Sequence, residues 1–394
     1  MSHGRSLLCA ALVLVAATAG CPGTSYQTAC TVEPVKLAGS SLTLLKDARL
    51  DRVGDGFFLL GSDGNNVSWA SLTAAGHLGD EHTLAVPAHV DGPWLAMAGT
   101  AGAADHVLVA YTVAPAASGD TTADLMIISA NADGTAPSAP LVVGQLPVGA
   151  ALVSMGSGRG GMHAGLAWVA PATTVVGARI FDGAGQPVGA DLALGTIGST
   201  SSCLRFSPGR DDLTLGFLDL SGTPPAHAFV GTEINVQGTA GPSFRLSLGT
   251  KAAGCVELVA TDTGYGLSWH NQDVAVMAGI FNSETDQMFI LNQVRSDAQV
   301  SGGVQAVAGY GWVGKDYLVV IAHQSGAEAF SVNSMGGRTS GSVTFPSVNG
   351  FTGPLSGQPV GAAYYATYGD YMSAANLASG QGPGSRYFVK VTCQ

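Results

Sequence analysis

Seven polar residues near the ends of apolar segments could take part in catalysis or ligand recognition. Two carboxylates about 5–10 Å apart can hydrolyse a glycosidic bond, and imidazoles can bind a metal ion or transfer protons. His270 and His323 could share such a role because they lie about one sequence repeat apart. The seven candidates are Asp63, Asn65, Asp219, His270, Asp273, His323 and Glu328.

The sequence lacks the motifs that usually mark catalysis. It contains no His-Glu-x-x-His motif, no close group of His and Cys, and no Gly-x-Ser-x-Gly segment. We therefore predict neither a metal centre nor acyl-transfer chemistry. The segment GSGRGG (156–161) matches a dinucleotide-binding pattern, but an alternating apolar segment follows it where that pattern needs a helix. We interpret it as a turn and predict no cofactor.

Aspartates precede most of the alternating apolar segments. A ring of carboxylates could bind a cation, but an Asp beside a tight turn more simply accepts hydrogen bonds from its own backbone. We interpret these residues as turn residues; they are Asp55, Asp105, Asp211, Asp262, Asp316 and Asp370.

The candidate residues belong to an internal repeat of about fifty residues. Seven alternating apolar segments, such as DGFFLLGS and DYLVVIAH, align at Gly61, Tyr111, Trp168, Phe217, Trp269, Ile321 and Ala375. A turn-containing segment such as FDGAGQPVGADLAL follows most of them, which is the pattern of a β-hairpin. We therefore predict four strands in each repeat.

Seven four-stranded repeats predict an all-β fold, a seven-bladed β-propeller whose last blade is completed by the N-terminal strand. A pair of β-sandwiches or a β-solenoid is the alternative. Solenoid repeats are shorter, however, and two sandwiches would not keep one period along the chain. In a propeller, the loops after the second strand of each blade gather at one end of the channel, which would bring the seven candidates together.

Residues 1–20 have the layout of a signal peptide. Arg5 precedes an apolar run of about fourteen residues, which is shorter than the ~20 residues of a membrane-spanning helix. The segment TAGC, ending at Cys21, resembles the lipobox of bacterial lipoproteins, although Thr18 stands where that motif usually has Leu. The resemblance implies a lipid on Cys21 and, because Pro22 follows, an outer-membrane location. The segment ATA also fits an ordinary signal-peptidase site, so a periplasmic or secreted protein is the alternative.

Cysteine parity agrees with lipidation. Loss of the leader leaves five cysteines, and a lipid on Cys21 leaves four that can pair in an oxidising compartment. Cys30 and Cys393 lie in strand-like segments at the two ends of the folded part, so we expect a disulfide that closes the ring. Cys203 and Cys255 occupy the same position in consecutive repeats. They could bridge neighbouring blades or remain buried thiols.

These patterns predict a signal peptide (1–20), a lipid-anchored tether (21–29) and one propeller domain (30–394). The formal net charge of −11 argues against nucleic acid as a partner. We expect a non-catalytic binding or scaffold protein at the bacterial cell envelope, attached to the membrane through its lipid. Its partner would be an envelope protein or a glycan, and a monomer is the simplest expectation. The alternative is a propeller-type glycoside hydrolase or lyase that acts on polysaccharide.

Overall fold

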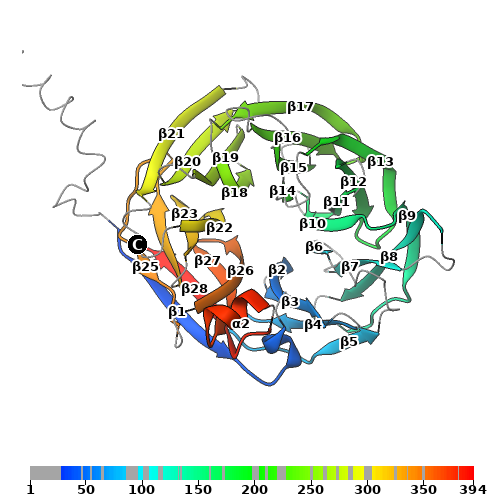
Figure 1. Ribbon diagram of the computed structural model, residues 1–394, viewed down its shortest axis with the longest axis horizontal. Coiled ribbons are helices and arrows are strands. Elements are labelled where there is room, and N and C mark those ends of the chain that lie inside the picture. Colours follow the sequence, from blue (N-terminus) through cyan, green and yellow to red (C-terminus); the bar gives the residue numbers. More distant parts are fainter. Residues whose placement is uncertain are drawn as a thin grey trace, which may run out of the picture.

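The computed structural model describes residues 28–394 apart from internal gaps, and it shows a ring of seven four-stranded antiparallel sheets (Figure 1). The gaps are residues 46–47, 54–55, 64–65, 86–95, 101–105, 114–118, 132, 134, 159–160, 171–173, 198–203, 209–211, 220–227, 249–251, 261–263, 272–274, 283–286, 297–303, 324–325, 335, 348–350 and 380. The sheets are the blades of a seven-bladed β-propeller, as the sequence repeat predicts.

The blades are numbered in chain order, with strands given from the channel to the rim. Blade 1 is β2 (Arg49–Val53), β3 (Gly56–Ser62), β4 (Asn66–Leu72) and β5 (His82–Ala85); blade 2 is β6 (Ala96–Thr100), β7 (His106–Val113), β8 (Thr122–Asn131) and β9 (Leu141–Pro147); blade 3 is β10 (Ala151–Ser157), β11 (His163–Val169), β12 (Val175–Asp182) and β13 (Pro187–Thr196). Blade 4 is β14 (Leu204–Pro208), β15 (Asp212–Asp219), β16 (Ala228–Asn235) and β17 (Ala240–Ser247); blade 5 is β18 (Ala252–Ala260), β19 (Gly264–Asn271), β20 (Ala275–Asn282) and β21 (Gln287–Ser296). Blade 6 is β22 (Val304–Trp312), β23 (Tyr317–His323), β24 (Gly326–Val332) and β25 (Val343–Thr344); blade 7 is β26 (Phe351–Val360), β27 (Ala363–Tyr371), β28 (Ser385–Cys393) and β1 (Cys30–Leu37). Two short helices, η1 (Ser41–Leu44) and α2 (Ala374–Ser379), lie in connections.

The second strand of a blade is apolar on both of its sides because a neighbouring blade covers each face. All eight residues of β15 are buried. Leu213 and Leu215 of this strand pack with Ala167 and Val169 of blade 3 in one cluster. On the other side of blade 4, Leu218 packs in a second cluster with residues of blade 5. The hydrophobic core is therefore a series of clusters between blades.

The turn between the third and fourth strands has the same hydrogen bonding in blades 1, 3, 4 and 6. A glycine with a positive φ donates its N–H to the carbonyl oxygen three residues earlier; these glycines are Gly76, Gly185, Gly238 and Gly336. In blades 3 and 4, the side chains of Asp182 and Asn235 also accept backbone N–H groups of the turn. Such turns favour Gly and Asx residues, and the outer hairpins predicted from those residues are confirmed.

The first and last strands of the chain meet in blade 7. β1 pairs with β28 along its whole length, beginning with Cys30 opposite Cys393. These two cysteines, 363 positions apart, form a disulfide. Beyond it, Ala29 and Gln394 exchange backbone hydrogen bonds of 2.9 and 3.0 Å. Both predictions, the N-terminal strand in the last blade and the Cys30–Cys393 disulfide, are confirmed.

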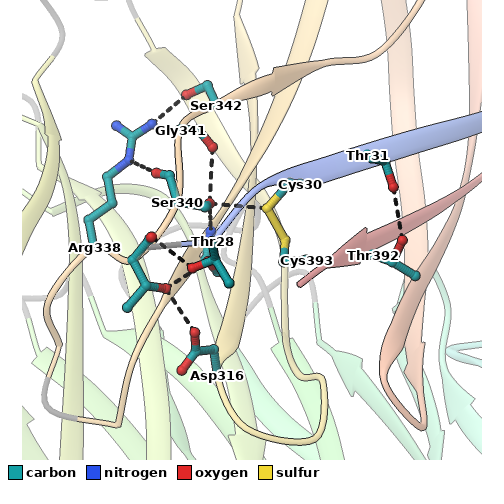
Figure 2. The surroundings of a disulfide bond; sticks show 12 residues. Thr28, Cys30, Thr31, Asp316, Arg338, Ser340, Gly341, Ser342, Thr392 and Cys393 are labelled. Carbon is teal, nitrogen blue, oxygen red and sulfur yellow. Dashed lines mark hydrogen bonds between the residues drawn. A yellow bond between two sulfur atoms is a disulfide. The ribbon is translucent and has the colours of Figure 1, made fainter. Parts of the chain in front are cut away.

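The rim of blade 6 also holds the N-terminal segment (Figure 2). Thr28 donates hydrogen bonds from its N–H and its hydroxyl to the Thr339 carbonyl oxygen, at 3.3 and 2.7 Å. The Ser340 hydroxyl oxygen lies 3.0 Å from Cys30 Sγ. The Thr339 hydroxyl donates to the Asp316 carboxylate at 2.8 Å. The chain therefore reaches blade 7 across the outer edge of blade 6.

Two further side chains join blade 7 to blade 1. Arg386 of β28 is fully buried, and its guanidinium donates to the carbonyl oxygens of Ala48, at 3.2 Å, and Leu45. Ser356 of β26 accepts a hydrogen bond from the Leu50 N–H at 3.1 Å and donates to the Leu50 carbonyl oxygen at 3.0 Å. Blades 7 and 1 are thus joined at the channel by Ser356 and in the middle of the blade by Arg386.

One repeat boundary was predicted wrongly. The segment DYMSAANL, with Ala375 at the aligned position, was expected to form the second strand of the last repeat. The second strand of blade 7 is instead β27, and Ala375 lies in α2. The Ser373 hydroxyl accepts a hydrogen bond from the Asn376 N–H at 3.1 Å and so caps this helix. The tyrosine-rich strand β27 is followed closely by α2, so two neighbouring segments fit the sequence pattern. A constant repeat of about fifty residues favoured the second of them, which forms the helix.

Several sequence predictions lie outside the described residues. These include the leader, Cys21 and the position of Cys203, while Cys255 lies on β18 without a described side chain. The proposed Cys203–Cys255 bridge therefore stays a prediction. In the part of the chain that the structure describes, no helix is long and apolar enough to cross a membrane.

Candidate functional site

The predicted loop residues lie in several separate places. Asp63 is exposed and accepts hydrogen bonds from the backbone N–H and the side-chain amide of Asn66, at 2.7 and 2.9 Å, so it stabilises the turn after β3. Asp219 forms an ion pair with Arg245, which lies on the rim strand β17. Asn65 and Asp273 lie outside the described residues.

Three of the candidates, His270, His323 and Glu328, lie on the strand faces between blades 5 and 6. His270 is on the same side of β19 as Gly266, which faces two tyrosines of blade 6. His323 is on the same side of β23 as Ile321, which packs against blade 5. Glu328 pairs directly with Ile321 and shares its side of the sheet. All three polar side chains are buried, so they belong to the interior and not to an open loop face. Among the described residues, no group of three or more His, Cys, Asp or Glu could hold a metal ion.

Two of the six aspartates that precede the apolar segments are described, and both accept side-chain hydrogen bonds. Asp316 accepts a hydrogen bond from the Thr339 hydroxyl at 2.8 Å, and Asp370 accepts one from Ser347 at 2.6 Å. The remaining four aspartates of that set lie outside the described residues. The GSGRGG segment ends β10 and leads into the strand β11, where Gly161 donates a turn hydrogen bond to Gly158. It has the strand context that the turn interpretation requires.

The central channel contains a cavity of about 340 Å³. Its wall comes from the innermost strands of blades 1, 4, 5, 6 and 7, with Tyr364 of β27 behind them. The charged residues among the described lining are Arg49, Arg205 and Glu257, and they are accompanied by hydrogen-bonding groups such as Gln358. A volume of this size falls within the range of small-ligand pockets, so the cavity is the candidate site.

The three charged residues lie at one level of the channel. Arg49, Arg205 and Glu257 pair with Leu60, Gly216 and Ser268 respectively, and each of these partners immediately precedes the aligned position of its repeat. The strands that carry them surround the channel, with β2 across the opening from β14 and β18 (Figure 1). Arg49 therefore faces the Arg205 and Glu257 side of the cavity from the opposite wall.

Arg205 and Glu257 form an ion pair between neighbouring blades. Arg205 Nε and Nη2 lie 3.2 and 3.1 Å from Glu257 Oε1, and Nη1 donates to the Leu204 carbonyl oxygen at 3.2 Å. The negative charge of Glu257 raises the pKa of Arg205. The arginine side chain is 40% exposed and the glutamate 13%. The pair therefore presents charge to the channel while it is partly shielded from solvent.

Glycines at the same level make room for a tyrosine. A Cβ atom at Gly309, which is the blade 6 counterpart of Arg205, would collide with the Tyr364 hydroxyl, and one at Gly357 would collide with the Tyr364 ring. Burial raises the pKa of Tyr364, and the nearby negative charge of Glu257 adds to the effect. Tyr364 consequently stays neutral and contributes a phenol to the cavity wall.

Asp51 lies beside the cavity and has an unusual protonation equilibrium. Burial raises the pKa of its carboxyl to about 7, against the lowering effects of the Arg52 N–H and the positive charge of Arg49. The Gln358 amide nitrogen lies 3.5 Å from one of its oxygens, and the Arg52 N–H donates to the same oxygen at 3.0 Å. The charge near Arg49 therefore changes around neutral pH.

Sequence reasoning missed these channel residues, although a signal was present. Arg205 and Glu257 lie 52 positions apart and hold the same place in consecutive repeats. Opposite charges at one repeat position on neighbouring innermost strands predict an ion pair across the blade boundary.

No protein-family model and no curated protein matches this sequence. Among solved structures, one from an analysis of two prolyl endopeptidases aligns with 89% of this chain at 14% identity and a TM-score of 0.50. This chain spans about half, 51%, of that protein. BBS1N in complex with ARL6DN aligns with 91% of this chain and 95% of its own at 12% identity (TM-score 0.49). The Dos1 propeller aligns with 88% and 77% at 8% identity (TM-score 0.47). At 14% identity, the first likeness shows the fold alone.

Proposed function

We propose that this protein is an exported, lipid-anchored β-propeller that binds a ligand or partner at the bacterial cell envelope without transforming it. The observation that carries the proposal is the composition of the channel cavity. Glu257 is the one acid among its described lining residues, and it is already paired with Arg205. Asp51 lies beside the cavity but outside its lining, where it accepts hydrogen bonds from the Arg52 N–H and the Gln358 amide. Hydrolysis by the usual glycosidase mechanism needs two carboxylates that flank the substrate. A cavity with one paired acid is suited to holding a molecule.

The alternative, a glycoside hydrolase or lyase, has less support. Of the acids that could serve it, Asp63 accepts the hydrogen bonds of its own turn and Asp219 is paired with Arg245 at the rim. Neither belongs to the cavity lining. Carboxylates that are held in turns and rim pairs are poorly placed to act together on a substrate.

The position of the first described residue supports an anchor at Cys21. Thr28 lies at the outer edge of blade 6, where it forms a parallel bridge with Ser340. The chain between Cys21 and Thr28 can span at most about 25 Å. A tether that starts at the rim can reach a membrane without passing through the ring.

The anchor is tested with the full-length protein in a bacterial host fed an alkyne-labelled fatty acid. We expect label on the wild-type protein and its recovery in the membrane fraction. Cys21→Ser should lose both the label and the membrane association. Cys9→Ser is the matched control, because it removes a leader cysteine and should leave both unchanged. Label on Cys21→Ser, or a soluble wild-type protein, would contradict the anchor.

Binding without catalysis is tested with immobilised protein and envelope extracts. The protein should retain a glycan or protein fraction, and soluble protein should compete for it. Retained polysaccharide should show no new reducing ends and no unsaturated products after prolonged incubation. Appearance of either product would favour the hydrolase or lyase.

A further inference from the structure

The described lining of the channel cavity is positively charged within an acidic protein. Arg49 and Arg205 contribute two positive charges and Glu257 one negative charge, and Asp51 beside Arg49 adds a second negative charge only as the pH rises through about 7. The cavity is therefore positive below that pH, whereas the whole chain has a formal net charge of −11. Opposite charge inside a partly enclosed site attracts a ligand more strongly than the same charge at an open surface. The cavity is therefore suited to a small anion.

Arg205 retains hydrogen-bonding capacity beyond its ion pair. A guanidinium has five N–H groups. Nε and one N–H of Nη2 are directed to Glu257, and one N–H of Nη1 is directed to the Leu204 carbonyl oxygen. Among the described contacts, one N–H on each terminal nitrogen remains, and the side chain is 40% exposed. Two such N–H groups can hold both oxygens of a planar carboxylate.

The rest of the wall is suited to hydroxyl groups. Glu257 can accept a hydrogen bond from a ligand hydroxyl, Gln358 can donate and accept, and Tyr364 presents a neutral phenol. The volume of about 340 Å³ corresponds to about eleven water molecules at ~30 Å³ each. This space accommodates one six-carbon sugar ring, whereas a folded peptide segment would not fit.

We propose that the channel cavity binds a sugar acid, with the ligand carboxylate on Arg205 and its hydroxyls on Glu257, Gln358 and Tyr364. The inference rests on the proposed binding function and adds its ligand class. The ligand is a free sugar acid or the terminal unit of an acidic polysaccharide, since both present the same carboxylate and hydroxyls.

The test is calorimetric titration of the full-length protein in detergent with galacturonate and with galactose, which differs in lacking the carboxylate. We expect saturable binding of galacturonate and no binding of galactose. Arg205→Gln should weaken galacturonate binding by about tenfold or more, because a hydrogen bond to a charged group is lost. Glu257→Gln should tighten binding, because it removes the negative charge that competes for Arg205.

Arg245→Gln is the matched control. It also removes an arginine from an Arg–carboxylate pair and changes the net charge by the same amount, but Arg245 lies at the rim. Its galacturonate affinity should equal that of the wild type. Equal weakening by Arg205→Gln and Arg245→Gln would overturn the inference, as would loss of binding in Glu257→Gln. Thermal unfolding of each variant shows whether it is folded.

The outcomes separate this inference from the proposed function. Equal binding of galactose and galacturonate would leave a binding protein and overturn the acid-specific site. Absence of binding to either sugar would also overturn the inference, while the envelope retention experiment still decides the proposed function. Tighter binding of trigalacturonate than of the monomer would support the site and identify a polysaccharide end as its source. Equal binding of the two would support the site and identify the free acid.

Discussion

Two blade boundaries of this ring are held together by different chemistry. At the seam between blades 7 and 1, the fully buried Arg386 donates to carbonyl oxygens of the segment that leads into β2, and a disulfide joins the strands that close blade 7. At the boundary between blades 4 and 5, Phe244 stacks on Tyr265 with ring centroids 5.5 Å apart. The polar link at the channel there is the partly exposed pair of Arg205 and Glu257.

The difference follows the connectivity of the chain. Blades 4 and 5 are consecutive in sequence, and they are held by apolar packing and by a buried hydrogen bond of 2.6 Å between the Thr214 and Tyr265 hydroxyls. The partly exposed ion pair at the channel therefore need not contribute much to stability. Blade 7 combines strands from both ends of the chain, and its assembly carries a large entropic cost of loop closure. We infer that the seam adds a covalent bond and a buried charged side chain to contacts of this kind, while the other boundary leaves its charged groups available for a ligand.

The largest effect is expected from removal of the disulfide. Cys30→Ser combined with Cys393→Ser should lower the free energy of unfolding by about 4–5 kcal/mol, because the bond closes a loop of several hundred residues in the unfolded chain. Urea unfolding of the oxidised proteins measures the difference. Wild-type protein treated with a reductant should approach the variant. An unchanged urea midpoint would show that the seam is stable without the bond.

A smaller loss is expected from the buried arginine of the seam. Arg386→Leu leaves the carbonyl oxygens of Ala48 and Leu45 without their donor, at a cost of about 2–4 kcal/mol. Arg245→Leu is the comparison, since that side chain is 52% exposed. Its loss leaves no backbone carbonyl oxygen without a donor in the described contacts, so it should cost less than Arg386→Leu. Equal losses in the two variants, measured by urea unfolding, would remove the contrast between seam and rim.

The third effect changes in size with pH. Because the pKa of Asp51 is about 7 in the folded protein against an ordinary value of 3.8, the folded state keeps a proton that the unfolded state loses. Wild-type stability should therefore fall, relative to Asp51→Asn, as the pH rises from about 4 to about 7, and stay lower above that. Because Asp51 is only half-buried, we expect a difference on the order of 2 kcal/mol at pH 8.

Thermal unfolding of both proteins at pH 4, 6 and 8 measures this difference. Asp133 provides the opposite case, because the hydroxyl and the N–H of Thr135 lower the pKa of its carboxyl. Asp133→Asn should not gain stability as the pH rises. A constant difference between Asp51→Asn and the wild type at all three values would contradict the assigned protonation of Asp51.

The smallest effect is expected at the boundary of blades 4 and 5. Arg205→Gln should change the free energy of unfolding by less than about 1 kcal/mol, because a partly exposed ion pair contributes little to stability. The same variant is expected to lose galacturonate binding, so stability and binding would separate at this residue. A loss of stability as large as that of Arg386→Leu would assign Arg205 to the framework of the ring.

The ring of blades could be predicted from the sequence because it depends on turn residues, which act locally, and on two cysteines that can form a covalent bond. Turn residues such as Asp182 and Gly185 dictate the outer hairpins, and cysteines at both ends of the folded part predict its closure. The wrong prediction at Ala375 also has a local cause. A repeat of constant length requires a strand there, but the residues form a capped helix, α2. Blade 7 takes its fourth strand from the N-terminus, so no outer hairpin follows β28 to mark this repeat.

The candidate site was harder to predict because its residues come from separate repeats. The alternation of apolar residues predicts where strands lie. It does not predict that a single charged residue on an innermost strand, such as Arg205 or Glu257, lines the channel. The strand ends were also placed too early: His270 and His323 lie within β19 and β23. They are therefore buried between blades, where a loop position had been expected.

The sulfur bridge at the rim determines how the molecule responds to mechanical load. Tension on the chain ahead of Cys30 reaches the bridge before it reaches the backbone hydrogen bonds of β1. The force then passes directly to Cys393 and into β28, so β1 cannot be peeled away from its neighbour one residue at a time. If the domain is tethered by its N-terminus, β1 would stay paired with β28 under a force that would separate these two strands in a protein without the disulfide.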